Sequence, residues 1–228
     1  MTHAAQGAFS ETTVASFLGA LAARTPAPAG GAAAGLSAAV GAALLAMVAR
    51  YTTGPRYAER EQQMLGLVDE LGALEARAVD NVRADQAAFG AVAAAYELPK
   101  DTDEARARRS AAIKDGLREA IGPPLALAEV CTRLAALARV IAEQGHQPIV
   151  SDVGTGAACI GAAIEGTLIN LTANSASLPE GEAGGRLADT CAALLAARDD
   201  LRQVVEEARA RYRRRTDASG GAAAEPAS

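Results

Sequence analysis

The longest hydrophobic stretch lies near the start of the chain, over Gly31 to Ala49, where 19 consecutive residues carry no charge. Ala, Leu, Met and Val favour helix, and a helix that is apolar all round has to be buried. Most of these residues are Ala or Gly, so the helix is thin and lets neighbouring backbones approach closely. Prolines and glycines at 26–31 end any helix that precedes it. We therefore expect a core helix entered through a loop, and such a loop at a helix N-terminus is a generic ligand site.

Helical periodicity continues through the rest of the chain. Apolar positions spaced by three and four predict helices over about 11–24, 57–96, 102–121, 123–144 and 186–215. A second apolar, glycine-rich helix is predicted over about 153–174. Helix N-caps are expected at Ser10, at Asp101, and at Ser151 or Asp152. Because no segment alternates in the manner of a strand, the predicted fold is all-α, a bundle of about six to seven helices with two buried Ala/Gly-rich helices.

The same pattern sets the expected domain organisation. Residues 10–215 form a single helical domain, residues 1–9 a flexible N-terminus, and the Gly/Ala-rich residues 216–228 a disordered tail. The two apolar helices also satisfy a length criterion for membrane spans. We prefer buried core helices, because Ala and Gly contribute little transfer energy, and we keep a small membrane protein as an alternative.

One polar residue interrupts the apolar stripe of the helix predicted over 57–96. The stripe consists of Met64, Val68, Leu71, Leu74, Ala78, Val82, Phe89, Val92 and Tyr96. Asp85 fills the gap between Val82 and Phe89 in phase with the stripe. A buried carboxylate is costly unless it is paired or its pKa shifts. Three interpretations follow: a salt bridge to a neighbouring helix, a site carboxylate, or a roll of the helix that leaves Asp85 solvated.

Composition narrows the function classes. The formal net charge of −5 argues against nucleic-acid binding. Two histidines and no HExxH motif cannot supply a protein-only metal site. Three widely spaced cysteines without a CxxC are expected to be buried thiols in a reducing cytoplasm. Residues 1–13 lack the basic and apolar regions of a secretory signal, so we expect a cytoplasmic protein with no metal.

Six segments, in order, resemble the formiminotetrahydrofolate cyclodeaminases and the related methenyltetrahydrofolate cyclohydrolases. They are FLGALAARTPAPAGGAAAGLSAAVGAALLAMVA (17–49), YTTGPRY (51–57), DQAAF (85–89), YELPK (96–100), VSDVG (150–154) and GTLINLTAN (166–174). Each segment is weak alone, but the ordered series is specific and the resemblance covers about residues 9–212. It implies a folate one-carbon enzyme that converts 5-formiminotetrahydrofolate to 5,10-methenyltetrahydrofolate plus ammonia, or alternatively a methenyltetrahydrofolate cyclohydrolase.

The resemblance also implies a site. Asp85 and Asp152 are the expected catalytic residues, for proton transfer or charge stabilisation. Substrate-binding residues are expected at Gly30, Gly31, Arg56, Ser151, Asn170 and Asn174. Asn170 and Asn174 would hydrogen-bond the pterin, and Arg56 would bind the glutamate tail of a tetrahydrofolate derivative, polyglutamylated or not. No cofactor beyond the tetrahydrofolate substrate is needed, and the family implies a homodimer.

Three departures from the family pattern bear on activity. Ala29 and Ala32 stand in the turn where the family has Gly-Gly-Gly-Ser, so a hydroxyl is missing. The basic segment after Gly54 is one residue shorter, and His146 stands where the family has Asn. These changes leave open a further alternative, a catalytically impaired folate-binding or scaffold protein on the same fold.

Overall fold

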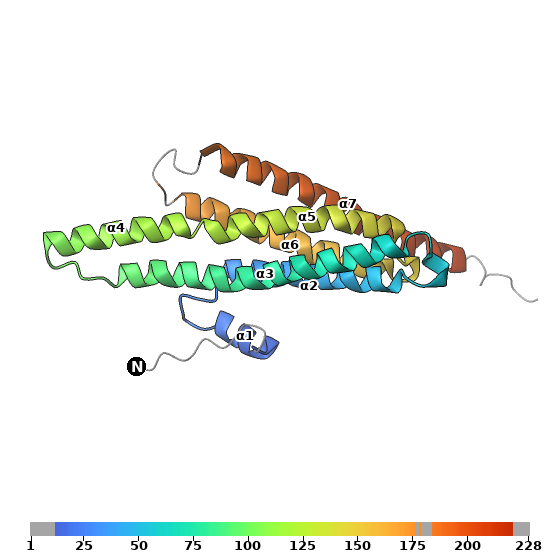
Figure 1. The fold of residues 1–228 in the computed structure, drawn as a ribbon, viewed down its shortest axis with the longest axis horizontal. Coiled ribbons are helices and arrows are strands. Elements are labelled where there is room, and N and C mark those ends of the chain that lie inside the picture. Colours follow the sequence, from blue (N-terminus) through green and yellow to red (C-terminus); the bar gives the residue numbers. More distant parts are fainter. Residues whose placement is uncertain (1–11, 177, 179–183, 221–228) are drawn as a thin grey trace, which may run out of the picture.

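The computed structural model describes residues 12–176, 178 and 184–220, and they form an elongated helical bundle (Figure 1). The helices are α1 (Val14–Leu21), α2 (Gly30–Tyr51), α3 (Glu61–Tyr96), α4 (Asp103–Glu119), α5 (Gly122–Gln144), α6 (Val150–Ser175) and α7 (Gly184–Gly220). Two short 3-10 turns, η2 (Pro55–Tyr57) and η3 (Gln147–Ile149), follow α2 and α5. No strand occurs within the described ranges, so the all-α prediction is confirmed.

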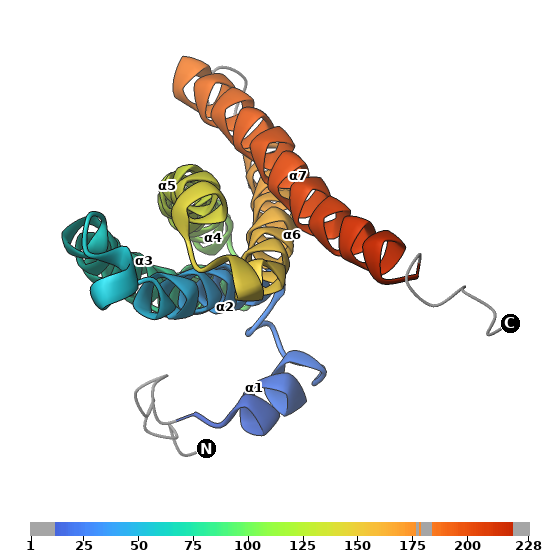
Figure 2. The ribbon, with the colours of Figure 1, turned by 90° about the vertical axis from the view of Figure 1, so that its right-hand side faces the viewer.

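Helix α2 lies at the centre of the packing, between α3 and α6, with α5 against all three and α7 on the outside (Figure 2). Its small residues explain how closely it packs. A Cβ placed on Gly41 would lie 2.5 Å from the Ile160 side chain, and one on Gly166 would lie 3.1 Å from Ala34. Both predicted Ala/Gly-rich helices are therefore core helices that meet along their glycines. Because α2 and α6 run antiparallel, the N-terminus of α2 lies beside the C-terminal part of α6.

Most of the apolar stripe of α3 is buried from Met64 to Val82, with Val68 partly buried, and Val92 is buried as well, but Phe89 and Tyr96 near its end are 44% and 51% exposed. Their expected burial is wrong for a geometric reason. The last turns of α3 run past the start of α2 and are flanked there by α4 (Figure 1). One partner helix covers less of the stripe than a bundle does.

Helix boundaries differ from the predictions at the caps. Thr13 caps α1 by accepting the Ser16 N–H, and Ser10 lies outside the described residues. Thr102, one residue after the predicted cap, accepts the Ala105 N–H at the start of α4. Helix α6 begins at Val150, directly after η3, so neither Ser151 nor Asp152 is its N-cap.

At the other end of the chain, α7 continues through Gly220, so residues 216–220, expected in the tail, are helical. Residues 1–9 and 221–228 of the predicted flexible ends lie outside the described ranges.

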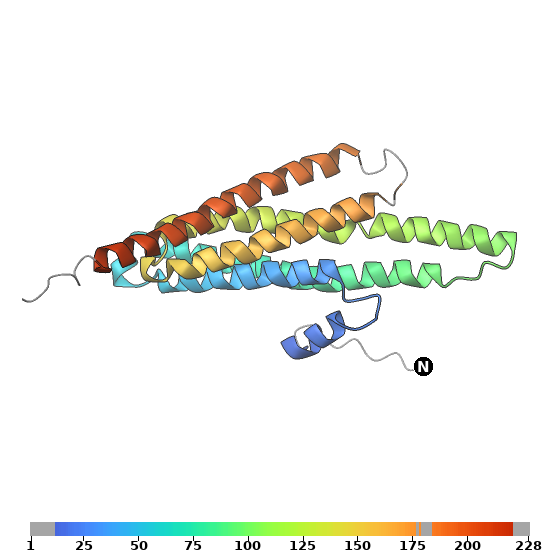
Figure 3. The ribbon, with the colours of Figure 1, turned by 180° about the vertical axis from the view of Figure 1, so that it is seen from behind.

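Helix α1 stands off the bundle and contacts it through one side (Figure 3). Phe17 is 4% exposed and packs with Ala32 and Val82, whereas Val14 and Leu18 are 68% and 53% exposed. Phe17 thus ties α1 to the start of α2.

Two helical stretches, Gly30–Tyr51 and Gln147–Ser175, are long and apolar enough to cross a membrane. The most apolar window of the first is 61% buried inside the bundle, as for the core helix of a globular domain.

Candidate functional site

The carboxylate of Asp85 on α3 faces the N-terminus of α2. The side chain is half-buried and accepts a hydrogen bond from the Ala32 backbone N–H. Helix α2 has no side-chain cap of its own, because its N-cap residue is Ala29. Asp85 therefore satisfies a free N–H of α2 from a neighbouring helix, at the end where the helix dipole favours negative charge.

Gly31 makes this arrangement possible. A Cβ at position 31 would lie 1.9 Å from Asp85 Oδ1 and 2.4 Å from its carboxyl carbon. No side chain fits there while Asp85 stays in place. The glycine of the loop is thus required by the carboxylate that approaches it.

Burial raises the pKa of Asp85, because desolvation penalises the charged form. The Ala32 N–H stabilises the anion and lowers the pKa, but by less than burial raises it. Asp85 takes part in none of the ion pairs formed by the described residues, so the salt-bridge interpretation does not hold. A carboxyl with a raised pKa at a helix N-terminus can donate a proton and then be stabilised as the anion.

The missing hydroxyl at Ala32 leaves this contact intact. The Ala32 side chain is fully buried against Phe17 and Val82, and it is the backbone N–H that meets Asp85.

The two asparagines of α6 lie at the same end of the bundle but differ in their partners. A Cβ on Gly30 would lie 3.7 Å from Asn170 Oδ1, so Asn170 borders the α2 N-terminus. Asn174 Nδ2 donates to the Ala120 carbonyl at 2.8 Å, which ties α6 to the junction of α4 and α5. Asn81, which the sequence analysis missed, makes a similar bond to the Pro123 carbonyl at 2.6 Å. Asp85, Gly30, Gly31 and Asn170 thus gather around one helix terminus.

The remaining predicted residues lie at the opposite end of the bundle. Arg56 is in η2 after α2, and Ser151 and Asp152 are in the first turn of α6. Eighteen residues of α6 separate Asp152 from Asn170, about 27 Å at the helical rise. The structure therefore divides the predicted site residues into two groups, and within one chain Asp85 and Asp152 do not meet.

The second group includes residues that the sequence analysis did not assign to the site. The Tyr57 hydroxyl lies 2.5 Å from His146 Nδ1, and the Tyr212 hydroxyl donates to Ser151 Oγ at 3.3 Å. The chain has only four tyrosines, and Tyr51, Tyr57 and Tyr212 all lie at this end. The small number of tyrosines in the sequence was the signal that could have pointed to these residues. A groove of about 620 Å³ between α6 and α7 begins here, lined by Ser151, Arg209 and Tyr212 among others.

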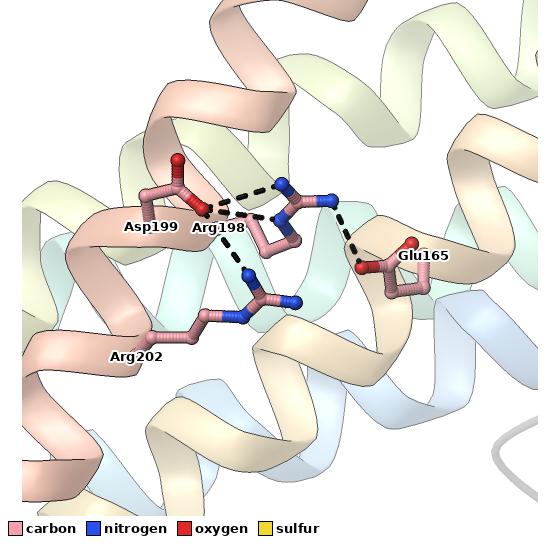
Figure 4. Close-up of polar contacts among 4 residues, drawn as sticks. All are labelled: Glu165, Arg198, Asp199 and Arg202. Atoms are coloured by element: carbon pink, nitrogen blue, oxygen red, sulfur yellow. Dashed lines mark hydrogen bonds and ion pairs between the residues drawn. The ribbon is translucent and has the colours of Figure 1, made fainter.

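Further along the same helices, charged groups neutralise one another. Arg198 Nη1 lies 3.2 Å from Glu165 and its Nη2 3.3 Å from Asp199, which also pairs with Arg202 at 3.5 Å (Figure 4). Only the Arg198–Glu165 pair joins α7 to α6, and with side chains 23% and 48% exposed it is expected to hold the two helices only weakly. Across the described part of the chain, no group of three or more His, Cys, Asp or Glu side chains is placed to hold a metal ion.

The cysteines are free thiols. Cys131 is fully buried, and burial raises its pKa to about 12. Cys159 and Cys191 are only half-buried, so the expectation of three buried thiols holds for one of them.

Comparison with known proteins identifies the family and the fold. A family model described as formiminotransferase-cyclodeaminase matches residues 13–193. A methenyltetrahydrofolate cyclohydrolase of Methylorubrum extorquens is 36% identical over 74% of this chain and 81% of its own length. The formimidoyltransferase-cyclodeaminase of Mus musculus is 35% identical over 72% of this chain, which spans only 30% of the mouse protein. A crystal structure of a Thermotoga maritima formiminotetrahydrofolate cyclodeaminase superposes with a TM-score of 0.76, covering 87% of this chain and 98% of that one at 22% identity.

Proposed function

The chain belongs to the formiminotransferase-cyclodeaminase family of folate one-carbon enzymes, and we propose that it converts 5-formiminotetrahydrofolate to 5,10-methenyltetrahydrofolate and ammonia. The observation that carries this proposal is the position of Asp85. Its carboxyl has a raised pKa and lies at the N-terminus of α2, in the space left by the absence of a side chain at Gly31.

The reaction needs a proton donor at this position. N10 of the substrate attacks the formimino carbon, a tetrahedral intermediate forms, and the exocyclic nitrogen leaves as ammonia once it is protonated. Asp85 gives that proton, and the resulting carboxylate is stabilised by the Ala32 N–H and sits close to the cationic methenyl product. A second group must take the proton that N10 loses, and we assign this role to Asp152.

Cyclohydrolysis of the methenyl group is the second candidate. One observation supports it: a protein named methenyltetrahydrofolate cyclohydrolase, from Methylorubrum extorquens, is 36% identical to this chain and is matched over 81% of its own length. Water then adds to the same carbon, and Asp85 again faces a tetrahedral carbon beside a cationic nitrogen.

We infer that the enzyme acts as an antiparallel homodimer. In one chain, Asp85 and Asp152 lie at opposite ends of the bundle. A two-fold axis perpendicular to α2 and α6 would place the Asp85 end of each subunit beside the Asp152 end of its partner. The outward sides of these helices support this. Val40 of α2 is 45% exposed, and Ile169 of α6 is 67% exposed. Large apolar side chains exposed on neighbouring helices fit an interface.

The reaction is tested by incubating the purified protein with each substrate separately. Formation of the methenyl chromophore with ammonia identifies cyclodeamination, and loss of 5,10-methenyltetrahydrofolate beyond the uncatalysed rate identifies cyclohydrolysis. Turnover of neither substrate by folded protein would refute the enzyme proposal and leave the impaired-protein alternative. Folate binding without turnover would favour that alternative directly.

The shared site is tested by mixing two variants. Asp85→Asn and Asp152→Asn homodimers are each expected to be inactive. After subunit exchange, heterodimers contain one intact site, so random mixing restores about a quarter of wild-type activity. Exchange without recovered activity would show that the two carboxylates do not share a site.

A further inference from the structure

The end of α2 carries a cluster of aromatic rings that the proposed chemistry does not use. His146 stacks on Tyr51, with ring centroids 6.1 Å apart and planes at 24°. Tyr57 meets the same imidazole edge-on at 5.9 Å, and its hydroxyl lies 2.5 Å from Nδ1. In a chain with 3% aromatic residues, two tyrosine rings against one imidazole are a concentrated feature.

Backbone contacts fix this cluster in place. The His146 N–H donates to Thr52 Oγ1 at 2.8 Å, and that hydroxyl donates to the Val48 carbonyl at 2.7 Å. Gly54 has a φ of 88°, and its N–H donates to Glu61 at 2.8 Å, which sets the turn that presents η2. The imidazole behind Tyr51 and the turn that carries Tyr57 are therefore preorganised, so ordering this part of the cluster costs a ligand little conformational entropy.

One ring is open to solvent, and a cation lies beside the cluster. Tyr51 is 61% exposed although one face stacks on His146. The guanidinium of Arg56 lies 5.6 Å from the centre of the Tyr57 ring. Arg56 enters none of the ion pairs made by the described residues, so its donors are available for a carboxylate. A flat ring with a carboxylate beside it matches this arrangement.

We propose that Tyr51, His146 and Arg56 form a shelf that binds the p-aminobenzoylglutamate half of the folate substrate. The benzamide ring stacks on the outer face of Tyr51, His146 supports Tyr51 from behind, and Arg56 meets a glutamate carboxylate. The assignment rests on the proposed function for the identity of the ligand. In the proposed antiparallel dimer, this shelf lies beside the Asp85 end of the partner subunit. The pterin half of the substrate would then be bound at that end of the partner.

The probe is p-aminobenzoylglutamate itself, because it carries no one-carbon group and its binding is independent of turnover. We expect saturable binding in an NMR titration of the wild-type protein. Tyr51→Ala should raise Kd about two- to ten-fold, the range for loss of one aromatic pair. Arg56→Gln should weaken the binding of p-aminobenzoylglutamate but leave the weaker binding of p-aminobenzamide unchanged, since that compound has the ring and the amide but no carboxylate.

Tyr96→Ala is the matched control. Tyr96 is 51% exposed and has its own arginine, Arg109, at 5.4 Å, but it lies at the end of α3, about 16 Å beyond Asp85 along the helix. Its Kd should equal that of the wild type. No saturable binding, an unchanged Kd for Tyr51→Ala, or an equal loss in both tyrosine variants would overturn the shelf and leave the cluster a structural link between α2 and the connection from α5 to α6. Absent turnover with intact binding would refute the reaction but not the shelf.

Discussion

Gly31→Ala tests, by adding one methyl group, whether catalysis requires the Asp85 carboxylate in the space beside Gly31. The added Cβ would lie 1.9 Å from Asp85 Oδ1, so the carboxylate has to move by about 1.5 Å to reach ordinary contact. Misplacing a reacting group by about 1 Å can cost roughly 100-fold in rate. We therefore expect kcat to fall about 100-fold or more, measured with the substrate that the wild-type protein turns over. The fall should approach that of Asp85→Asn.

The stability change is expected to be much smaller. Replacing glycine by alanine inside a helix contributes about 0.5–1 kcal/mol, whereas forcing a side chain into a filled space costs about 1–3 kcal/mol. Urea unfolding should thus show a loss of about 0–2 kcal/mol. Most of the damage of Gly31→Ala would be to catalysis.

Two glycines serve as controls. A Cβ on Gly41 would lie 2.5 Å from Ile160, in the core and ten residues along α2 from Gly31. Gly41→Ala should therefore lose stability but keep the wild-type kcat. A Cβ on Gly66 in α3 meets nothing within 4 Å, so Gly66→Ala should gain about 0.5–1 kcal/mol and stay active. Wild-type kcat in Gly31→Ala would refute the reasoning.

Three further predictions concern stability. Burial raises the pKa of Asp85 above 3.8, so the folded state binds more protons than the unfolded state, and the free energy of unfolding falls as pH rises from that value through the raised pKa. Asp85→Asn should remove this pH dependence, which urea unfolding of both proteins from acidic to neutral pH would measure. Asn174→Ala leaves the buried Ala120 carbonyl without its 2.8 Å bond and should cost about 1–3 kcal/mol, with a smaller effect on kcat/KM than Asn170→Ala; the reverse order would make Asn174 a ligand residue. Arg198→Ala breaks an exposed pair with Glu165 and should cost at most about 1 kcal/mol in thermal unfolding; a larger loss would show that the pair secures α7.

Much of the fold could be predicted because local signals determine it. Helix periodicity, Pro and Gly boundaries and the charge-free run identified α2, α3 and α6 and the burial of the first and last of these. The predicted caps were less accurate. Short connections such as η3 begin a helix directly from a turn, and a side-chain rule for N-caps does not describe that case. The exposure of Phe89 and Tyr96 depended on the relative lengths of two neighbouring helices, which a pattern on one helix does not contain.

The site was predicted in part. The in-phase position of Asp85 indicated a carboxylate in the interior, and the Gly30–Gly31 pair indicated close approach of a ligand or backbone. That these two signals describe one contact, with the Asp85 carboxylate in the space left by Gly31, required the antiparallel packing of α2 on α3. Likewise, no pattern within the sequence could place Asp152 at the opposite end of the bundle from Asp85. Distance along a helix becomes separation in space only when the topology is known.

The most direct test of the central claim compares wild-type and Asp85→Asn protein in the same turnover assay, with helicity measured by circular dichroism on both samples. If Asp85 is the proton donor, the Asp85→Asn protein should keep its helicity and lose at least about 100-fold in kcat, the lower end of the range for a general acid. An Asp85→Asn variant with the wild-type kcat would contradict the account.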